Sequence, residues 1–405
     1  MSDLRPPVNP NPPSARQPAG AARVGLVAIF LSTFLQLIGY FMLLPLLLLR
    51  LKGDGVSDSV AGLFAASGWA GIFLLTPLAS WITHRIGRRP ALWLAAAVPA
   101  GATLGFGLTD MLAFWFALEL VAGGAAGLRW VLAEAVVAEF SDAGNRGRNI
   151  GLFETMVGST FVIGPALLAA IGPTSAAALW TCLALVVAGL LASLAIPRLP
   201  DAEDDAQAVI GLRGVWHALR RHPIIMMAGF VGGFFESGVT SILPLFGLAL
   251  GLSAVAAALL VSASGLGSTL MMLPVGMLAD RWTDRAPGRR RMMVVLAIVT
   301  LLATCSLPFI TQLGWLAWPI VFLWGGAGGS LYTLAMIDIG SREQGVTLVN
   351  STAVLVLTYT LGSMTASASS GALLQWSPAF GFPALLAAVA LLGCVALWRY
   401  QTKLP

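Results

Sequence analysis

The sequence predicts an all-α membrane protein in which twelve transmembrane helices form two pseudo-symmetric six-helix bundles. Three observations support this prediction: the composition, the length of the apolar runs, and an internal repeat. Hydrophobic residues make up 58% of the 405 residues and charged residues only 10%, whereas a soluble domain carries about a quarter charged residues. The apolar runs are about 20 residues or longer, which suits helices crossing a ~30 Å hydrocarbon core, and they lack the alternation of barrel strands.

The internal repeat is seen as a constant offset between two parts of the chain. The pairs His84 and Asp280, and Arg85 and Arg281, are each 196 positions apart. One offset that holds over a stretch of sequence indicates two related halves. Each half carries a tight, arginine-rich loop after its second apolar run.

The apolar runs give the expected elements in order. In the first half they cover residues 24–49, 59–83, 91–109, 111–139, 149–171 and 175–197. In the second half they cover residues 224–250, 254–279, 292–310, 315–338, 346–373 and 379–400. We therefore predict an N-terminal bundle over 23–197 and a C-terminal bundle over 224–405.

The remaining segments are a tail and a linker. Residues 1–22 are rich in proline and poor in large apolar side chains, which predicts a disordered tail. The linker, 198–223, carries an acidic run and then Val209, Leu212, Trp216 and Leu219 at helical spacing. This pattern predicts an amphipathic helix on the membrane surface; a solvated linker is the alternative.

The basic residues predict the orientation. If both termini are cytoplasmic, Arg50 and Lys52 face outside, Arg129 lies within a helix, and the other 20 of the 23 basic residues are cytoplasmic. This asymmetry follows the positive-inside rule and explains the net charge of +5 without a nucleic-acid partner. We expect a multi-pass protein of the inner (plasma) membrane, in contact with the lipid bilayer and acting as a monomer.

Cysteine usage predicts neither disulfides nor a metal site. The three cysteines, Cys182, Cys305 and Cys394, lie singly inside apolar runs, while metal sites need clustered ligands. No phosphate-binding loop, zinc spacing or catalytic triad stands out, so we expect no cofactor and no enzymatic activity.

Twelve spans with a basic loop after the second and eighth spans resemble the major facilitator superfamily. The first loop is similar to that superfamily's motif G-x-x-x-D-R-x-G-R-R, with Ser80 in place of the glycine and His84 in place of the aspartate. The motif's other positions match at Arg85, Gly87, Arg88 and Arg89. The second copy keeps Gly276, Asp280 and Arg281.

Shorter segments resemble particular branches of the superfamily. Trp130 to Glu134, Asn145 to Arg148, Leu331-Tyr332 and Tyr359 to Ser363 are similar to the YcaD-like branch. Gly164-Pro165 in the fifth span partly resembles the antiporter motif of drug exporters. Where the superfamily's pattern has an arginine four residues before a glycine, this chain has Glu119 before Gly123, so the proton-coupling role of that arginine does not carry over.

Ionisable residues inside the bilayer are costly and are therefore candidates for function. Glu236 lies about twelve residues into the seventh span, near the midplane. The resemblance implies that this span lines the central cavity. We expect Glu236 to carry protons; the alternative is a carboxyl group that only hydrogen-bonds neighbouring helices.

Arg129 and Glu119 share one stripe of the fourth span, about 15 Å apart along the axis. Arg129 is expected either to bind substrate or to form a structural ion pair with an acid on another helix, for example Glu236. Glu134 and Glu154 fall at similar depths if the fourth and fifth spans form a hairpin. Two neighbouring carboxylates hold a proton more tightly, which suggests a role in coupling; pairing with arginines is the alternative.

Two further acids end the fourth and tenth spans at matching positions. Glu139 and Asp338 are expected to pair with arginines of the two basic loops, forming a latch that closes the cytoplasmic side. Because a carboxylate accepts hydrogen bonds from a helix N-terminus better than a histidine does, Asp280 should contribute more to the latch than His84. Ordinary surface pairing is the alternative.

Four polar residues within the spans are candidates for orienting a ligand: Gln36, Tyr40, Tyr332 and Asn350. Each alone is also explained by a helix–helix hydrogen bond. Together these features predict a secondary transporter that moves a small organic molecule by alternating access, with proton-coupled export as the first hypothesis. Uptake or exchange of an organic anion, and a non-transporting membrane sensor or assembly partner, are the alternatives.

Overall fold

The computed structural model describes residues 19–401 except 57, 143, 173–174, 199–208, 239–242, 253, 282–285 and 378. The predicted tail up to residue 18 and the acidic run of the linker lie outside the described residues. The N-terminal half consists of α1 (Ala19–Gly53), α2 (Asp58–Leu75), η1 (Thr76–Leu78), α3 (Ala79–Ile86), α4 (Arg88–Leu108), α5 (Leu112–Glu139), α6 (Arg146–Ile171) and α7 (Ala176–Leu194). After the linker helix α8 (Gly211–Arg221) follow α9 (Pro223–Gly233), η3 (Phe234–Gly238), α10 (Leu243–Ala249), α11 (Ala254–Asp280), α12 (Ala286–Ser306), η4 (Leu307–Phe309), η5 (Gly314–Leu316), α13 (Ala317–Gly340), α14 (Gly345–Trp376) and α15 (Gly381–Gln401).

Ten helices of the described residues are long and apolar enough to cross a membrane. The second and seventh predicted spans are built from shorter pieces. The 3-10 turn η1, which contains Pro77, separates α2 from α3, and the π-helical turn η3 continues α9 up to Gly238. With these two interrupted segments the described residues account for twelve spans, and the predicted all-α membrane fold is confirmed.

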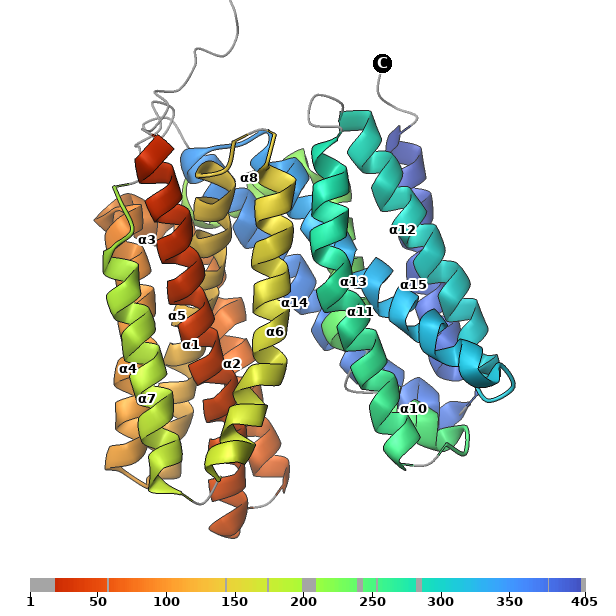
Figure 1. Ribbon diagram of the computed structural model, residues 1–405, viewed down its shortest axis with the longest axis horizontal. Helices are drawn as coiled ribbons and strands as arrows, with labels where there is room; N and C mark the ends of the chain where they lie inside the picture. Colours follow the sequence, from red (N-terminus) through yellow and green to blue (C-terminus); the bar gives the residue numbers. More distant parts are fainter. Residues whose placement is uncertain are drawn as a thin grey trace, which may run out of the picture.

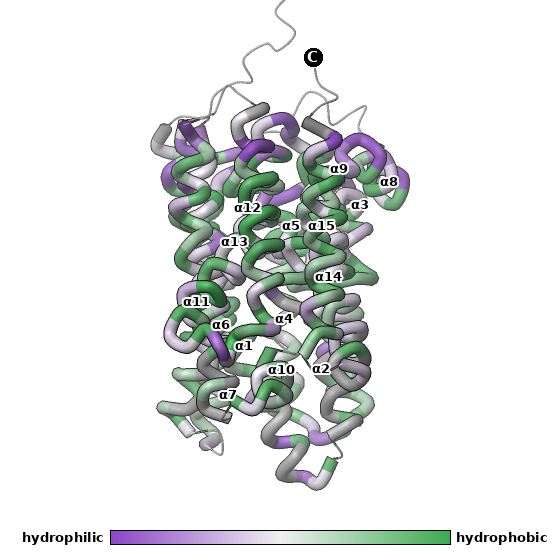
Figure 2. Tube along the Cα trace, turned by 90° about the vertical axis from the view of Figure 1, so that its right-hand side faces the viewer, coloured by the Kyte–Doolittle hydropathy of each residue, from purple (hydrophilic) through white to green (hydrophobic). Residues whose placement is uncertain are grey.

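The spans form two bundles that stand side by side. Figure 1 shows α1–α7, coloured red to yellow-green, in one bundle and α9–α15, green to blue, in the other. Hydrophilic residues gather at the end that carries α8, while most of the length of the helices is apolar (Figure 2). We call this the basic end, because the arginine-rich starts of α4, α6 and α12 lie there.

Glycines allow equivalent helices to cross closely in both bundles. A side chain at Gly71 in α2 would collide with the carbonyl oxygen of Leu120 in α5, and one at Gly267 in α11 would collide with that of Phe322 in α13. Gly71 and Gly267 are 196 positions apart, the offset of the sequence repeat. The repeat therefore preserves a backbone contact, the usual way in which membrane helices pack without a hydrophobic driving force.

The two bundles join through α6 and α11. Side chains at Gly147 and Gly276 would each collide with the carbonyl oxygen of the other glycine. Further along the same pair of helices, the Thr155 hydroxyl donates to the carbonyl oxygen of Thr269 at 3.0 Å. These contacts involve the first part of α6 and the last part of α11, so the bundles meet in the half of the molecule nearest the basic end.

The linker helix α8 is tied to both bundles. The backbone amide of Gly211 donates to Ser80 Oγ at 2.8 Å, and Asn350 Nδ2 donates to the carbonyl oxygen of Val209 at 2.7 Å. Along α8, Leu212 and Trp216 are exposed and Ala218 is buried. An amphipathic helix thus occupies the position that the sequence predicts, with an exposed apolar face beside its arginines.

The α2–α5 crossing gives a direct stability test. Replacing Gly71 with Ala should lower the melting temperature of the detergent-purified protein by several degrees, because the new methyl group meets a backbone carbonyl that cannot rotate away. Gly101→Ala is the matched control, since nothing lies within 4 Å of that position and alanine favours a helix by ~1 kcal/mol over glycine. Equal melting temperatures for the two variants would contradict the close crossing.

Candidate functional site

Three carboxyl groups, two of them buried and that of Glu236 half-buried, meet where the two bundles join. Glu134 lies on α5, Glu154 on α6, and Glu236 in the π turn η3 of the other bundle. The side chains of Glu134 and Glu154 lie within hydrogen-bonding reach of each other, and the charge of Glu236 acts on Glu154. Two carboxyl groups at this separation can hydrogen-bond only if one of them carries a proton.

Glu134 connects the two bundles. Tyr332 of α13 donates its hydroxyl to both carboxylate oxygens of Glu134, at 2.6 and 2.8 Å. Trp130, one turn before Glu134 on α5, donates its indole N–H to Oε1 at 2.5 Å. The carboxyl group is therefore held by neutral donors, one from each bundle.

Glu236 and Glu154 differ in how completely they are satisfied. Glu236 accepts a hydrogen bond from Ser268 Oγ at 2.8 Å and interacts with the Tyr359 hydroxyl. Glu154 is 6% exposed, and its Oε1 atom has no hydrogen-bond partner among the described residues. An unsatisfied buried carboxyl oxygen costs free energy. Glu154 is therefore the acid of the cluster that can still accept a hydrogen bond or a positive charge.

Three aromatic rings adjoin the acids. The ring centroids of Trp130 and Tyr359 are 5.6 Å apart, those of Trp130 and Tyr332 6.2 Å, and those of Tyr332 and Tyr359 5.0 Å. Tyr332 and Tyr359 belong to the C-terminal bundle and Trp130 to the N-terminal bundle. A relative movement of the bundles would separate the indole from the two phenol rings.

Arg129 does not belong to this cluster, and the expectation that it pairs with Glu236 is wrong. Its Nη2 atom donates to Ser32 Oγ at 2.6 Å and to Thr33 Oγ1 at 3.3 Å, both on α1. No carboxylate of the described residues forms a salt bridge with it. Successive helix positions point about 100° apart, so Trp130 faces the other bundle while Arg129 faces α1.

The other predicted ligand-orienting residues lie apart from the three acids. Glu119 is buried, lies against Gly68 of α2, and hydrogen-bonds the Tyr40 hydroxyl. Gln36 donates to the carbonyl oxygen of Ala96 at 3.0 Å inside the N-terminal bundle. Asn350 holds the linker before α8 instead of facing the acids.

Two carboxylates at the basic end accept hydrogen bonds from helix N-termini of the opposite bundle. Asp280 accepts from the amides of Gly147 and Arg148 at the start of α6, at 2.6 and 2.8 Å. Glu139 accepts from the amide of Gly345 at the start of α14, at 2.9 Å. Both contacts benefit from the helix dipole, and both exist only while this end is closed.

The basic loops support these contacts from within each bundle. Arg88 pairs with Glu139 at 2.5 Å, and Asp338 pairs with Arg289 at 3.4 Å and with Arg342 at 3.0 Å. The side chains of His84, Arg85 and Arg281 are exposed. The guanidinium group of Arg89 stacks on the ring of Trp93. Gly87 takes a positive φ of 87° between α3 and α4. Each of these ion pairs lies inside one bundle, whereas the carboxylate–amide contacts link the two bundles at the basic end.

Two features of the site could not be singled out from the sequence. Ser268 is one of many small residues in α11, and only the fold brings it to Glu236. The clue to Trp130 is its spacing of four residues before Glu134, which places both on one helix face.

Gly164, which the sequence analysis selected for its motif, lies where α6 closely approaches Phe41 and Met42 of α1.

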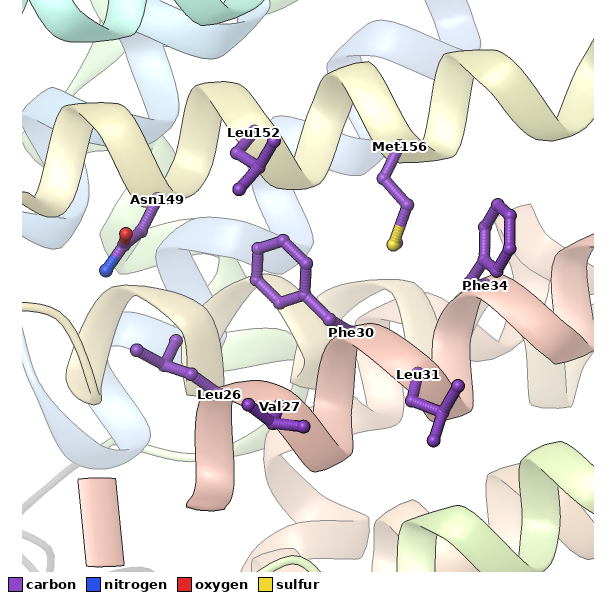
Figure 3. A pocket seen from close by; sticks show the side chains of 8 residues that line it. All are labelled: Leu26, Val27, Phe30, Leu31, Phe34, Asn149, Leu152 and Met156. Carbon is purple, nitrogen blue, oxygen red and sulfur yellow. The ribbon is translucent and has the colours of Figure 1, made fainter. Parts of the chain in front are cut away.

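A separate groove of about 450 Å³ lies between α1 and α6 on the outside of the N-terminal bundle (Figure 3). Its walls include Phe30, Phe34, Leu152 and Met156, and Asn149 contributes the polar group at one end. Val27 and Leu31 on its rim are exposed. An apolar groove on the outer surface of a membrane bundle suits lipid chains, so we do not assign it to the transport site.

The model of the Major Facilitator Superfamily matches residues 29–352. The chain belongs to this superfamily. Its relatives include the MFS-type transporter YfkF of Bacillus subtilis, 24% identical over 82% of this chain and 84% of YfkF. The MFS-type transporter YcaD of Escherichia coli O7:K1 is 26% identical over 81% of this chain and 83% of YcaD. The resemblance to the YcaD-like branch is thereby confirmed.

Solved structures support the same fold. The human organic anion transporter MFSD10 superimposes with a TM-score of 0.74 at 17% identity, over 96% of this chain and 100% of MFSD10. The MFS transporter FucP in the outward conformation gives a TM-score of 0.76 at 15% identity, over 95% of this chain and 100% of FucP. At these identities the likeness concerns the fold alone. This superfamily membership establishes a secondary transporter, not an enzyme.

The carboxylate–amide contacts generate a test of the latch. Asp280→Asn and Glu139→Gln should each open the basic end, because a neutral acceptor loses ~1–2 kcal/mol of charge-assisted hydrogen bonding, a shift of roughly five- to thirtyfold in population. The distance between spin labels at Gly144 and Gln344, with the three native cysteines replaced, measures this opening.

Two variants serve as controls for the latch. His84→Asn changes an exposed side chain and should leave the distance distribution as in the wild type. Asp338→Asn breaks ion pairs inside one bundle and should lower the melting temperature without opening the basic end. A larger opening from His84→Asn than from Asp280→Asn would show that the second copy of the loop does not contribute more to the latch than the first.

Proposed function

We propose that this transporter exports a small organic compound across the inner (plasma) membrane in exchange for protons. The Glu134–Glu154 pair is the observation that carries the proposal. These two acids and Glu236 share one buried site, and no arginine, lysine or histidine of the described residues hydrogen-bonds or ion-pairs with any of the three. Three neighbouring carboxylates without a counter-charge repel one another strongly in a low dielectric, which favours proton uptake.

Alternating access would connect this site to each side of the membrane in turn. The other titratable groups facing the acids are Tyr332 and Tyr359, both from the C-terminal bundle. Because Tyr332 binds an acid of the N-terminal bundle, rocking of the bundles would remove a donor from Glu134. The loss of this donor by itself favours proton uptake by Glu134, and proton release would instead follow from the water and the substrate that enter the opened site.

The direction of export rests on the placement of the site. In our proposal the basic end is cytoplasmic, as the positive-inside rule favours, and both termini lie on that side. The acids lie in the half of the molecule nearest the basic end, where the bundles are in contact. Opening that end would expose them to the cytoplasm, the side from which an exporter takes its substrate.

Neutral substitutions of the acids test the proton coupling. Glu154→Gln and Glu236→Gln should reduce accumulation driven by a pH gradient in proteoliposomes to background, because neither amide can take up and release the coupling proton. The substrate for this assay comes from a growth and uptake screen of a compound panel. Asp142→Asn, which alters an exposed acid at the basic end, should transport at the wild-type rate.

A wild-type rate for both neutral variants would refute the proposed coupling. The amount of folded, membrane-inserted protein is measured for each variant, so that lost transport is not confused with lost expression. Glu154→Asp retains a titratable carboxyl group and should keep part of the gradient-driven transport. Its activity would link the defect of Glu154→Gln to the missing proton site and not to altered packing.

Exchange of an organic anion remains a second candidate, because Nε and Nη1 of Arg129 have no hydrogen-bond partner among the described residues. If Arg129 binds an anion, Arg129→Ala should raise the apparent KM for that anion strongly, and Arg129→Lys should restore part of the binding. Under our main proposal the KM of the exported compound is unchanged in both variants. Ligand-dependent shifts in melting temperature separate the two cases.

A further inference from the structure

We propose that the substrate is an aromatic or lipophilic organic cation, which binds between the three acids and the rings of Trp130, Tyr332 and Tyr359. This inference rests on the proposed proton-coupled transport and adds the chemical class of the substrate. Two independent observations support it: the charge of the site, and the presence of aromatic faces next to that charge.

The charge of the site selects for a positive ligand. The acids come from three helical segments, and among the described residues their hydrogen-bond donors are hydroxyl and indole groups and not arginine or lysine. A buried anion at this position would meet only like charges, whereas a cation would supply the missing counter-charge. The unpartnered Oε1 atom of Glu154 gives such a cation a position to approach.

The rings favour an organic cation over a metal ion. Aromatic faces attract cations that are too weakly hydrated to keep a full shell of water, such as quaternary ammonium or phosphonium groups. Among the described residues, no group of three histidine, cysteine, aspartate or glutamate side chains is placed to hold a metal ion. The acids therefore provide charge without metal geometry, and the rings provide the contact surface.

Movement of the bundles would open the space for the ligand. In the present conformation the three rings pack on one another, with centroids 5.0 to 6.2 Å apart. Trp130 moves with one bundle and both tyrosines with the other, so opening the basic end would uncover the ring faces. A cation entering there would displace the shared proton of Glu134 and Glu154, which gives exchange of a cation for a proton.

A pair of ions with the same shape and opposite charge tests the proposal. Tetraphenylphosphonium should bind the purified, full-length protein saturably in equilibrium dialysis, and its binding should release protons into a weakly buffered solution. Tetraphenylborate should not compete with it. Glu154→Gln and Glu236→Gln should each weaken tetraphenylphosphonium binding by about tenfold or more, while Asp142→Asn should bind as the wild type does.

The aromatic contribution is tested separately. Trp130→Leu should weaken tetraphenylphosphonium binding by about tenfold, the loss expected for one desolvated cation–π contact. Trp130→Phe keeps an aromatic face and should bind more tightly than Trp130→Leu. Melting curves confirm that each variant is folded before its binding is compared.

Three results would overturn the cationic substrate. They are equal competition by tetraphenylborate, saturable phosphonium binding that the acid variants leave unchanged, and pH-driven transport of an anionic or neutral compound with no phosphonium binding. The third result would leave the proposed proton coupling intact. Conversely, phosphonium binding without proton release and without gradient-driven transport would refute the coupling while supporting a cation site.

Discussion

The close approach of α6 and α11 determines how the two bundles of this transporter fit together. Neither helix has a side chain at the crossing point of Gly147 and Gly276, and the backbone of each glycine touches that of the other. Only at this separation can Asp280 reach the amides at the start of α6. The same crossing brings Glu154, two turns further along α6, towards the helix that carries Ser268.

In the part of the chain that the structure describes, the three acids have no partner of opposite charge. Removing carboxylates from water is expensive, and an ion pair compensates only with good geometry. Here the acids are held by a phenol, an indole and a serine hydroxyl, and two of the acids lie within hydrogen-bonding reach of each other. Such a site is less stable than an apolar core of the same volume, a cost that fits the proton-coupling role that we propose for it.

The sequence predicts the helices well and their rotation about their own axes poorly. The length and polarity of the apolar runs are sufficient to place the spans, and the depth of Glu134 and Glu154 follows from counting residues to the turn between α5 and α6. A helix that is apolar all round, however, carries no signal for which face meets which neighbour. The partner of Arg129 could therefore not be predicted, nor could the positions of Gln36 and Asn350, because both depend on contacts between distant segments.

The repeat illustrates the same limit in a different way. Asp280 and His84 are equivalent by position, but in the first half the acceptor for the helix N-terminus is Glu139, which comes from α5 and is held by Arg88. Both halves thus have a carboxylate that accepts from a helix N-terminus of the opposite bundle, but the two carboxylates stand at non-equivalent positions of the repeat. Alignment of the two halves by residue identity alone would miss this substitution.

The hydrogen bonds between Tyr332 and Glu134 join residues 198 positions apart, on opposite sides of the interface. Breaking them changes the surroundings of a carboxyl group and the relative position of the bundles in a single event. Thermodynamic linkage makes this effect reciprocal. If protonation of the cluster changes the equilibrium constant between the two conformations by some factor, the conformational change alters the proton affinity of the cluster by the same factor. If the cluster titrates as we propose, the pH of the medium and the orientation of the bundles are linked even when no substrate is bound.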